Sequence, residues 1–173
     1  MKHVTLISTG GTIEKTYDER TGTLMNRVSI VDRMLEALRL EDLTINTLEL
    51  FSKDSLDITD DDRDRILQMV RVMLRDTSPQ RGGIVILHGT DTLSVTGELL
   101  CRELKSLTAP IVLTGAMRPY EMKSSDALQN LTEAVFAAGV LDPGVYVVAH
   151  GRALAFPGVV KDAARGTFVK QEG

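Results

Sequence analysis

Two short segments combine glycine with threonine in a pattern that could support nucleophilic chemistry. The segment 9–12 (TGGT) follows the apolar run VTLIS, and the segment 88–92 (HGTDT) follows the apolar run IVIL. Glycine permits positive φ and close backbone approach, so N–H groups beside it can hold a developing oxyanion. A threonine hydroxyl is a weak nucleophile until a neighbouring base or cation activates it. Attack of Thr12 on a carbonyl is therefore the chemistry to consider.

The second segment places a hydroxyl beside a carboxylate. In extended backbone the adjacent side chains of Thr90 and Asp91 point in different directions, so a small ligand could meet both groups. A carboxylate suits an ammonium group. Two local alternatives stay open: TGGT as a plain turn, and Thr90 or Asp91 as the cap of the following helix. A phosphate-binding loop is disfavoured, because neither G-x-G-x-x-G nor G-x-x-x-x-G-K-[ST] occurs here.

The elements that position these segments follow from apolar patterning. Short runs rich in Val and Ile at 4–8, 84–88, 110–114 and 145–149 predict strands buried on both faces, and 43–50 predicts a strand with one more polar face. Helical patterns lie at 29–39, 59–76, 93–107 and 124–139. Ser29 with Asp32 resembles a capping box, and Thr59 precedes a run of acids.

This alternation predicts an α/β fold with a mainly parallel (mixed) β-sheet and helices on both faces. We expect a single domain over residues 1–173, because the sequence contains neither a linker nor a repeat. Ligands of such sheets bind at the carboxyl ends of the strands. The segments 9–17, 51–57, 88–93, 114–126 and 150–162 are therefore the loops in which function should be sought.

Composition excludes several classes of function. The net charge is -4 with no basic cluster, which argues against nucleic acid and anionic membrane as partners. The single Cys101 rules out an internal disulfide and, with no secretory signal at the N-terminus, favours a cytoplasmic protein. So few His and Cys provide no metal-ligand cluster, and neither a metal nor another cofactor is expected. His88 and His150, each between a strand and a glycine, are interpreted as structural.

Five segments together resemble the motifs of bacterial-type L-asparaginases, which hydrolyse L-asparagine to L-aspartate and ammonia. They are TGGTI at 9–13, SKDS at 52–55, HGTDT at 88–92, TGAMRP at 114–119 and GVVKD at 158–162. Their order is that of the family, and the resemblance extends from residue 4 to about residue 168. It implies the three-layer fold of the N-terminal domain of those enzymes.

The resemblance also implies roles for individual residues. Thr12 would be the nucleophile that forms an acyl-enzyme. Thr90 would be the second catalytic threonine, with Lys161 beside it lowering the cost of negative charge on its hydroxyl. The family also has a catalytic tyrosine on a mobile lid after the first motif. Tyr17 would be this tyrosine, because it is the only one in that segment, although it lies closer to Thr12 than the family spacing.

Substrate binding is implied for a second group of residues. Asp91 would bind the α-ammonium and Ser52 would donate to the α-carboxylate, with Gly11 and Gly89 lining the site. Lys53 stands where the family has Gln or Glu, and its charge would repel the ammonium unless the side chain turns away.

One acid of the family has no counterpart here. Family members usually continue into a smaller C-terminal domain that lends an acidic residue to a neighbouring subunit's site, whereas this sequence ends at about that point. Glu14 and Glu19 are candidate substitutes by proximity to Thr12.

The leading hypothesis is an L-asparagine amidohydrolase that acts as a homo-oligomer, a dimer or a tetramer. The alternatives are a non-catalytic asparagine- or aspartate-binding protein with the same fold, and the amidase subunit of a tRNA-dependent amidotransferase.

Overall fold

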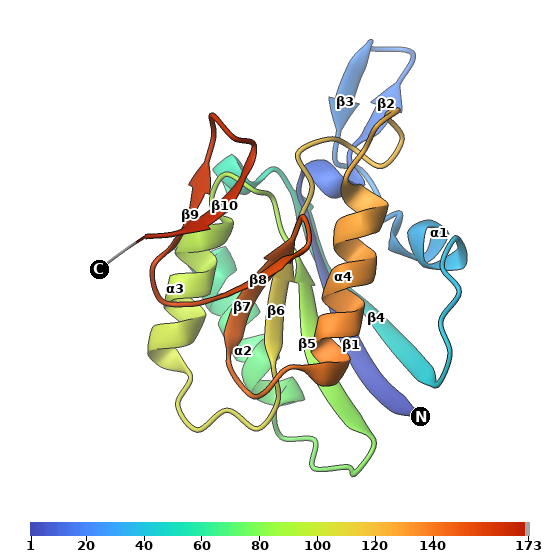
Figure 1. The fold of residues 1–173 in the computed structure, drawn as a ribbon. Helices are drawn as coiled ribbons and strands as arrows, with labels where there is room; N and C mark the ends of the chain where they lie inside the picture. Colours follow the sequence, from blue (N-terminus) through green and yellow to red (C-terminus); the bar gives the residue numbers. More distant parts are fainter. Residues whose placement is uncertain (172–173) are drawn as a thin grey trace.

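A six-stranded sheet forms the centre of the computed structural model, which describes residues 1–171 (Figure 1). All neighbouring strands run parallel except the last pair, which is antiparallel. The prediction of a mainly parallel, mixed sheet is therefore confirmed. In spatial order the strands are β4 (Leu43–Lys53), β1 (Lys2–Gly10), β5 (Arg81–Leu87), β6 (Ile111–Thr114), β7 (Val145–Ala149) and β8 (Arg152–Ala155).

Helices cover both faces of this sheet, as predicted. Helices α2 (Asp60–Met73) and α3 (Leu93–Glu103) pack on one face, and α1 (Val31–Glu36) and α4 (Ala127–Val140) pack on the other. Strand β5 shows the division, because Ile84 and Ile86 join the first core while Val85 and Leu87 join the second. Burial on both faces explains why these strands lack polar alternation.

The two predicted helix starts have different outcomes. Thr59 and Asp62 form a complete capping box at the start of α2, which agrees with the predicted start at Thr59. The capping box predicted for Ser29 is wrong, because α1 begins at Val31 and Ile30 is its N-cap. The Ser29 hydroxyl instead donates a hydrogen bond to the Glu14 carboxylate.

Several short elements were not predicted. Residues 9–17 and 150–162 were expected to be loops, but they contain the 3₁₀ turn η1 (Thr12–Glu14), β8 and parts of two hairpins. One hairpin pairs β2 (Thr16–Asp18) with β3 (Thr23–Met25), and the other pairs β9 (Val159–Asp162) with β10 (Thr167–Lys170). Both lie at the upper end of Figure 1, where β1 ends. A second 3₁₀ turn, η2 (Ser55–Asp57), follows β4.

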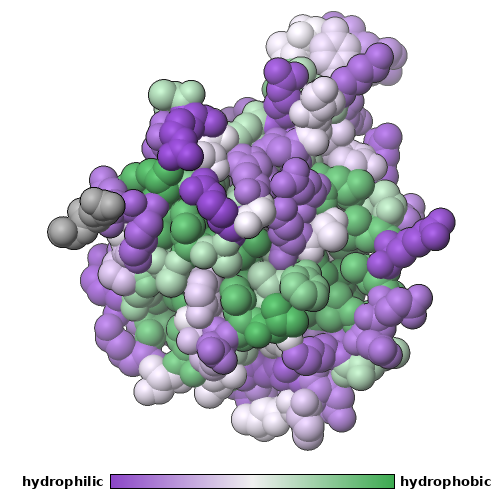
Figure 2. Space-filling view, in the orientation of Figure 1, coloured by the Kyte–Doolittle hydropathy of each residue, from purple (hydrophilic) through white to green (hydrophobic). Residues whose placement is uncertain are grey.

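The surface changes character along the sheet direction. Figure 2 shows hydrophilic residues gathered over the upper end of the molecule, around the two hairpins, and hydrophobic residues exposed in the middle of this face. Polar groups thus surround the end at which the parallel strands finish. None of the helices within residues 1–171 has the length and apolar character needed to cross a membrane.

Candidate active site

Backbone contacts between glycines bring the two threonine segments together. Gly10 and Gly11, at the end of β1, have φ values of +93° and +81°. A Cβ on Gly11 would lie 2.4 Å from the backbone nitrogen of Gly89, and a Cβ on Gly10 would lie 2.5 Å from that of Lys53. Only glycine allows both the dihedral angles and this approach. Thr12 and Thr90 are the residues that follow the two touching glycines Gly11 and Gly89.

Lys161 connects Thr90 and Asp91. From strand β9, its Nζ donates to Thr90 Oγ1 over 2.8 Å and to Asp91 Oδ1 over 2.6 Å. Thr90 is buried, while the side chains of Lys161 and Asp91 are 22% and 48% exposed. An ammonium that donates to a hydroxyl lowers the cost of negative charge on that oxygen. Asp91 therefore holds the cation through one oxygen and leaves the other, Oδ2, for a second partner.

The local capping alternative for this segment is wrong. Helix α3 begins at Leu93 with Thr92 as its N-cap, and neither Thr90 nor Asp91 caps it. Thr92 itself donates to the carbonyl oxygen of Ser55, over 2.8 Å, which joins this loop to the one after β4. Neither the Thr90 hydroxyl nor the Asp91 carboxylate is therefore used to cap this helix.

The His88 ring forms hydrogen bonds with this loop and with helix α3, which agrees with its interpretation as a structural residue. Its ring is fully buried, with Nδ1 2.8 Å from Gly89 O and Nε2 2.8 Å from Thr96 Oγ1. Because a carbonyl only accepts, Nδ1 carries the proton and Nε2 accepts from the threonine. Desolvation lowers the pKa of His88 to about 4. The neutral ring therefore serves to fix the Gly89 carbonyl.

Ser52 and Lys53 contribute in different ways. Ser52 Oγ is buried and has no hydrogen-bond partner within residues 1–171. The Lys53 side chain turns to the start of α2, where its Nζ lies 2.7 Å from Asp62 Oδ2. This bond from Lys53 is the main reason that the pKa of Asp62 falls to about 2. The backbone of Lys53 meets the glycine loop, where its carbonyl accepts from Gly11 N–H over 2.8 Å.

An ion pair at this end of the sheet was missed by the sequence analysis. Lys15 Nζ lies 2.5 Å from Asp54 Oδ2 and joins the loop after β1 to the loop after β4. This hydrogen bond lowers the pKa of Asp54, and the charge of Lys161 acts in the same direction. Opposite charges in two loops expected at one sheet edge were the available signal.

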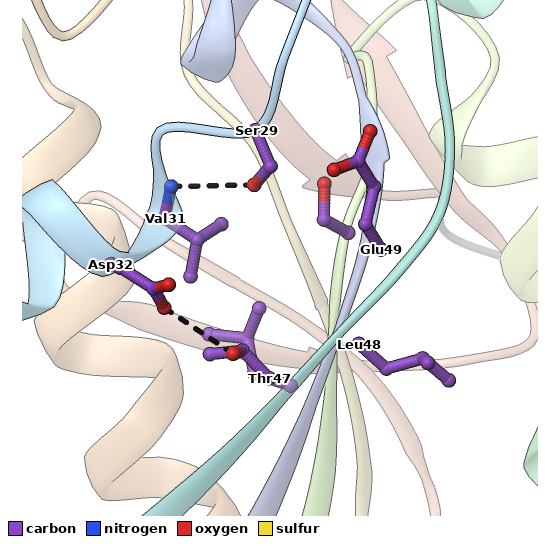
Figure 3. Close-up of a pocket in the computed structure, with 8 residues that line it drawn as sticks. Ser29, Val31, Asp32, Thr47, Leu48 and Glu49 are labelled. Atoms are coloured by element: carbon purple, nitrogen blue, oxygen red, sulfur yellow. Dashed lines mark hydrogen bonds between the residues drawn. The ribbon is translucent and has the colours of Figure 1, made fainter.

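Glu14, one of the two acids considered by proximity to Thr12, is engaged by hydrogen bonds to neighbouring chain segments. It is fully buried and accepts hydrogen bonds from the Ser8 and Ser29 hydroxyls and from Ile30 N–H. Burial raises its pKa. A cavity of about 150 Å³ lies beside it, lined by Ser8 and Ser29 among others. In Figure 3, which shows this cavity, Ser29 accepts from Val31 N–H and Thr47 donates to Asp32. The Glu14 side chain thus serves to fasten the chain on either side of the β2–β3 hairpin.

Tyr17 and Glu19 lie on that hairpin. Tyr17 is 59% exposed and lines a surface hollow with Leu24 and Met122. Its backbone N–H donates to Glu121 Oε2 over 2.9 Å. Glu19 is exposed in the turn between β2 and β3. The structure therefore does not place Tyr17 among the residues that surround Lys161, and residues 1–171 contain no cluster of His, Cys, Asp or Glu suited to a metal.

Comparisons with known proteins agree on one family. The family model described as "Asparaginase, N-terminal" matches residues 3–169. The thermostable L-asparaginase from Thermococcus kodakarensis superposes with a TM-score of 0.86 at 30% identity, covering 97% of this chain and 51% of that one. A probable cytoplasmic L-asparaginase from Campylobacter jejuni gives a TM-score of 0.80 at 26% identity, covering 98% and 52%.

The curated relatives have a different name. A glutamyl-tRNA(Gln) amidotransferase subunit of Methanococcus vannielii is 32% identical over 157 residues, which is 87% of this chain and 35% of the relative. The corresponding protein of Methanobrevibacter smithii is 34% identical over 151 residues, covering 87% and 34%. The chain thus spans about half the length of the solved structures and about a third of the curated relatives it matches.

Proposed function

The chain belongs to the asparaginase family, and from this premise we propose that it hydrolyses the side-chain amide of L-asparagine, giving L-aspartate and ammonia. The observation that carries the proposal is the contact of Lys161 Nζ with both Thr90 Oγ1 and Asp91 Oδ1, beside the Gly11–Gly89 contact. A small zwitterionic amide needs an anion for its ammonium, a donor for its carboxylate and hydroxyls near its carbonyl. Asp91, Ser52, Thr12 and Thr90 supply these groups.

The proposed reaction has two displacement steps. The Thr12 oxygen attacks the amide carbon, the C–N bond breaks, and ammonia leaves with the proton of the hydroxyl, so that an ester remains on Thr12. A water molecule next attacks this ester, the C–O bond to Thr12 breaks, and L-aspartate and the free hydroxyl are formed. Thr90 polarises the carbonyl or positions the water, and its own charge is favoured by Lys161.

Each binding group has a defined position in this proposal. Asp91 Oδ1 is occupied by Lys161, and Oδ2 binds the substrate ammonium. Ser52 Oγ, which lacks a partner within residues 1–171, donates to the α-carboxylate. The Lys53 ammonium lies at Asp62, so it does not repel the substrate ammonium.

Ammonia release from L-asparagine and L-glutamine tests the proposal, with purified wild-type protein, Thr12→Ala and Thr90→Val. Thr132→Val is the control, because it removes a hydroxyl from an exposed site on α4. We expect release from asparagine to fall by about a thousandfold or more in Thr12→Ala, as for loss of a nucleophile, and to be unchanged in Thr132→Val. Hydroxylamine should trap the ester as the hydroxamate of aspartate only when Thr12 is present.

Other outcomes would identify a different function. Release that persists in Thr12→Ala would overturn the assignment of the nucleophile. Asparagine binding measured by calorimetry without any release would indicate the binding protein instead.

A second candidate function is the amidase part of a tRNA-dependent amidotransferase. It is favoured by the curated relatives, which carry that name at 32% and 34% identity. In this case the same two threonines would release ammonia for transfer to another acceptor. Free ammonia production by the isolated chain at a steady multiple-turnover rate would favour the hydrolase over this alternative.

A further inference from the structure

A hydrogen-bonded chain of three side chains lies outside the proposed catalytic contacts. Thr167 Oγ1 is 2.8 Å from His150 Nδ1, and His150 Nε2 is 2.7 Å from Asp126 Oδ2. Thr167 is 8% exposed, and the side chains of His150 and Asp126 are 24% and 16% exposed. The three residues come from β10, from the end of β7 and from the start of α4. They therefore link the second hairpin to the main sheet.

The carboxylate end of this chain is firmly held. Asp126 accepts hydrogen bonds from the backbone N–H groups of Met117 and Arg118, each at 3.0 Å. Burial acts to raise the pKa of Asp126, but these donors and His150 outweigh it and keep the pKa below its ordinary value. The charged carboxylate orients the ring, with Nε2 donating and Nδ1 accepting from the Thr167 hydroxyl.

The backbone of His150 is held as well. Its φ is +53°, a left-handed conformation that is uncommon for residues other than glycine. The His150 N–H donates to Asn130 Oδ1 over 3.0 Å, and Asn130 Nδ2 donates to Gly115 O over 2.8 Å. The backbone of His150 is thus fixed, and with it the position of the imidazole. The hydrogen bond from the Thr167 hydroxyl to Nδ1 then fixes Thr167 relative to the main sheet.

Thr167 directly precedes Phe168, the residue opposite Lys161 in the β9–β10 hairpin. In the β9–β10 ladder Lys161 pairs with Phe168, and Asp162 pairs with Thr167. Successive strand residues point to opposite faces, so Phe168 shares the face of Lys161, and Thr167 anchors the other face. Phe168 is buried in the core, and its carbonyl accepts from Arg152 over 2.6 Å. The hairpin is therefore held on both faces at the position of Lys161.

We propose that Asp126, His150 and Thr167 act as positioning residues, which hold the β9–β10 hairpin so that Lys161 stays against Thr90 and Asp91. The placement of Lys161 does not depend on the proposed function, whereas the effect of these residues on turnover rests on it. A nucleophilic role for Thr167 is disfavoured, because its hydroxyl is buried and also accepts from Arg152 Nη2 over 2.9 Å.

Thr167→Val and Thr167→Ser form a matched pair for the test. Valine keeps the shape and removes the hydroxyl, whereas serine keeps the hydroxyl. We measure acetylation of individual lysines under limiting reagent by mass spectrometry. We expect Lys161 to be acetylated several-fold faster in Thr167→Val than in the wild type and in Thr167→Ser, with the exposed Lys105 unchanged as the internal reference.

The kinetic arm uses the same variants with and without Lys161→Met. In Thr167→Val we expect kcat to fall by about tenfold, as for a displaced catalytic group, with KM within about twofold. In the Lys161→Met background the same change should lower kcat by less than about twofold, because the two residues act through one group. Thr167→Ser should restore wild-type turnover.

The outcomes separate the two proposals. Unchanged Lys161 acetylation in Thr167→Val overturns the positioning role, whether or not the protein is active. Faster Lys161 acetylation in Thr167→Val, together with a wild type that releases no ammonia, supports the positioning role while the proposed function fails. Faster acetylation with unchanged kcat in an active enzyme overturns the kinetic part. If Thr167→Val does not fold, His150→Asn replaces it, since asparagine tolerates the left-handed backbone.

Discussion

Removal of the Ser52 hydroxyl should stabilise the chain while weakening substrate binding. Ser52 Oγ is buried and unpartnered within residues 1–171, and an unsatisfied buried hydroxyl costs about 1–3 kcal/mol. Ser52→Ala removes this cost and loses the packing of one oxygen atom, so the free energy of unfolding should rise by about 1 kcal/mol. The lost donor to the substrate carboxylate is worth about 1.5–3 kcal/mol, which corresponds to a rise in KM of about 10- to 150-fold.

Two other serines provide controls for this experiment. Ser94 Oγ is also buried without a partner in the described chain, so Ser94→Ala should gain stability with no change in KM. Ser8 donates to the Glu14 carboxylate, so Ser8→Ala should lose about 1.5–3 kcal/mol, as for a hydrogen bond to a charged group. Urea unfolding followed by circular dichroism gives the free energies, and initial rates of ammonia release give KM. A loss of stability in Ser52→Ala like that in Ser8→Ala, or an unchanged KM, would refute the reasoning.

Three further predictions follow from the site. Gly11→Ala should lower the free energy of unfolding by about 2–5 kcal/mol in urea unfolding, because it adds left-handed strain and overpacking against Gly89. The control Gly151→Ala should lower it by only about 1–2 kcal/mol, since Gly151 has a φ of +76° but no atom within 4 Å of an added Cβ. Equal losses in the two variants would contradict the tight contact. Lys161→Met should reduce kcat by about a hundredfold or more but lower stability by less than about 1 kcal/mol, because Asp91 is half exposed; a large loss of stability would show a structural role. As the pH rises above 4.5, the ordinary pKa of a glutamate, the wild type should lose stability relative to Glu14→Gln. Burial raises the pKa of Glu14 in the folded state, so the folded chain binds the Glu14 proton more tightly than the unfolded chain does. Parallel curves of stability against pH for the two proteins would show that Glu14 is not desolvated.

The sheet and its helices could be predicted because local pattern and burial agree. Strands such as β5 are apolar on both sides since each face meets a different core, and α2 has both a cap at Thr59 and an apolar stripe. The start of α1 was misjudged because Ser29 looked like a cap in isolation. Its hydroxyl is used by the Glu14 carboxylate, which no local pattern indicates.

The contacts within the site depend on chain segments far apart in sequence. The motif resemblance singled out Thr90 and Lys161, and the structure brings them to 2.8 Å. The resemblance did not single out the pair Lys15 and Asp54 or the pair Thr167 and His150. Strands as short as β9 and β10 carry no periodic signal, and the contacts of Thr167 can be predicted only once the register of these strands is known. The Lys53 side chain could be placed only once the start of α2 was known to lie beside it.

The groups proposed for catalysis differ in how firmly the fold holds them. Thr12 and Thr90 lie in the loops that follow β1 and β5. These central strands pair with each other, and their loops touch at Gly11 and Gly89. Lys161 instead lies in a two-stranded hairpin that is not part of the main sheet. A displacement of about 1 Å at a reacting group can cost about a hundredfold in rate. Of the three residues Thr12, Thr90 and Lys161, the main sheet constrains Lys161 least, and this is the residue that the Thr167–His150–Asp126 chain is proposed to hold in place.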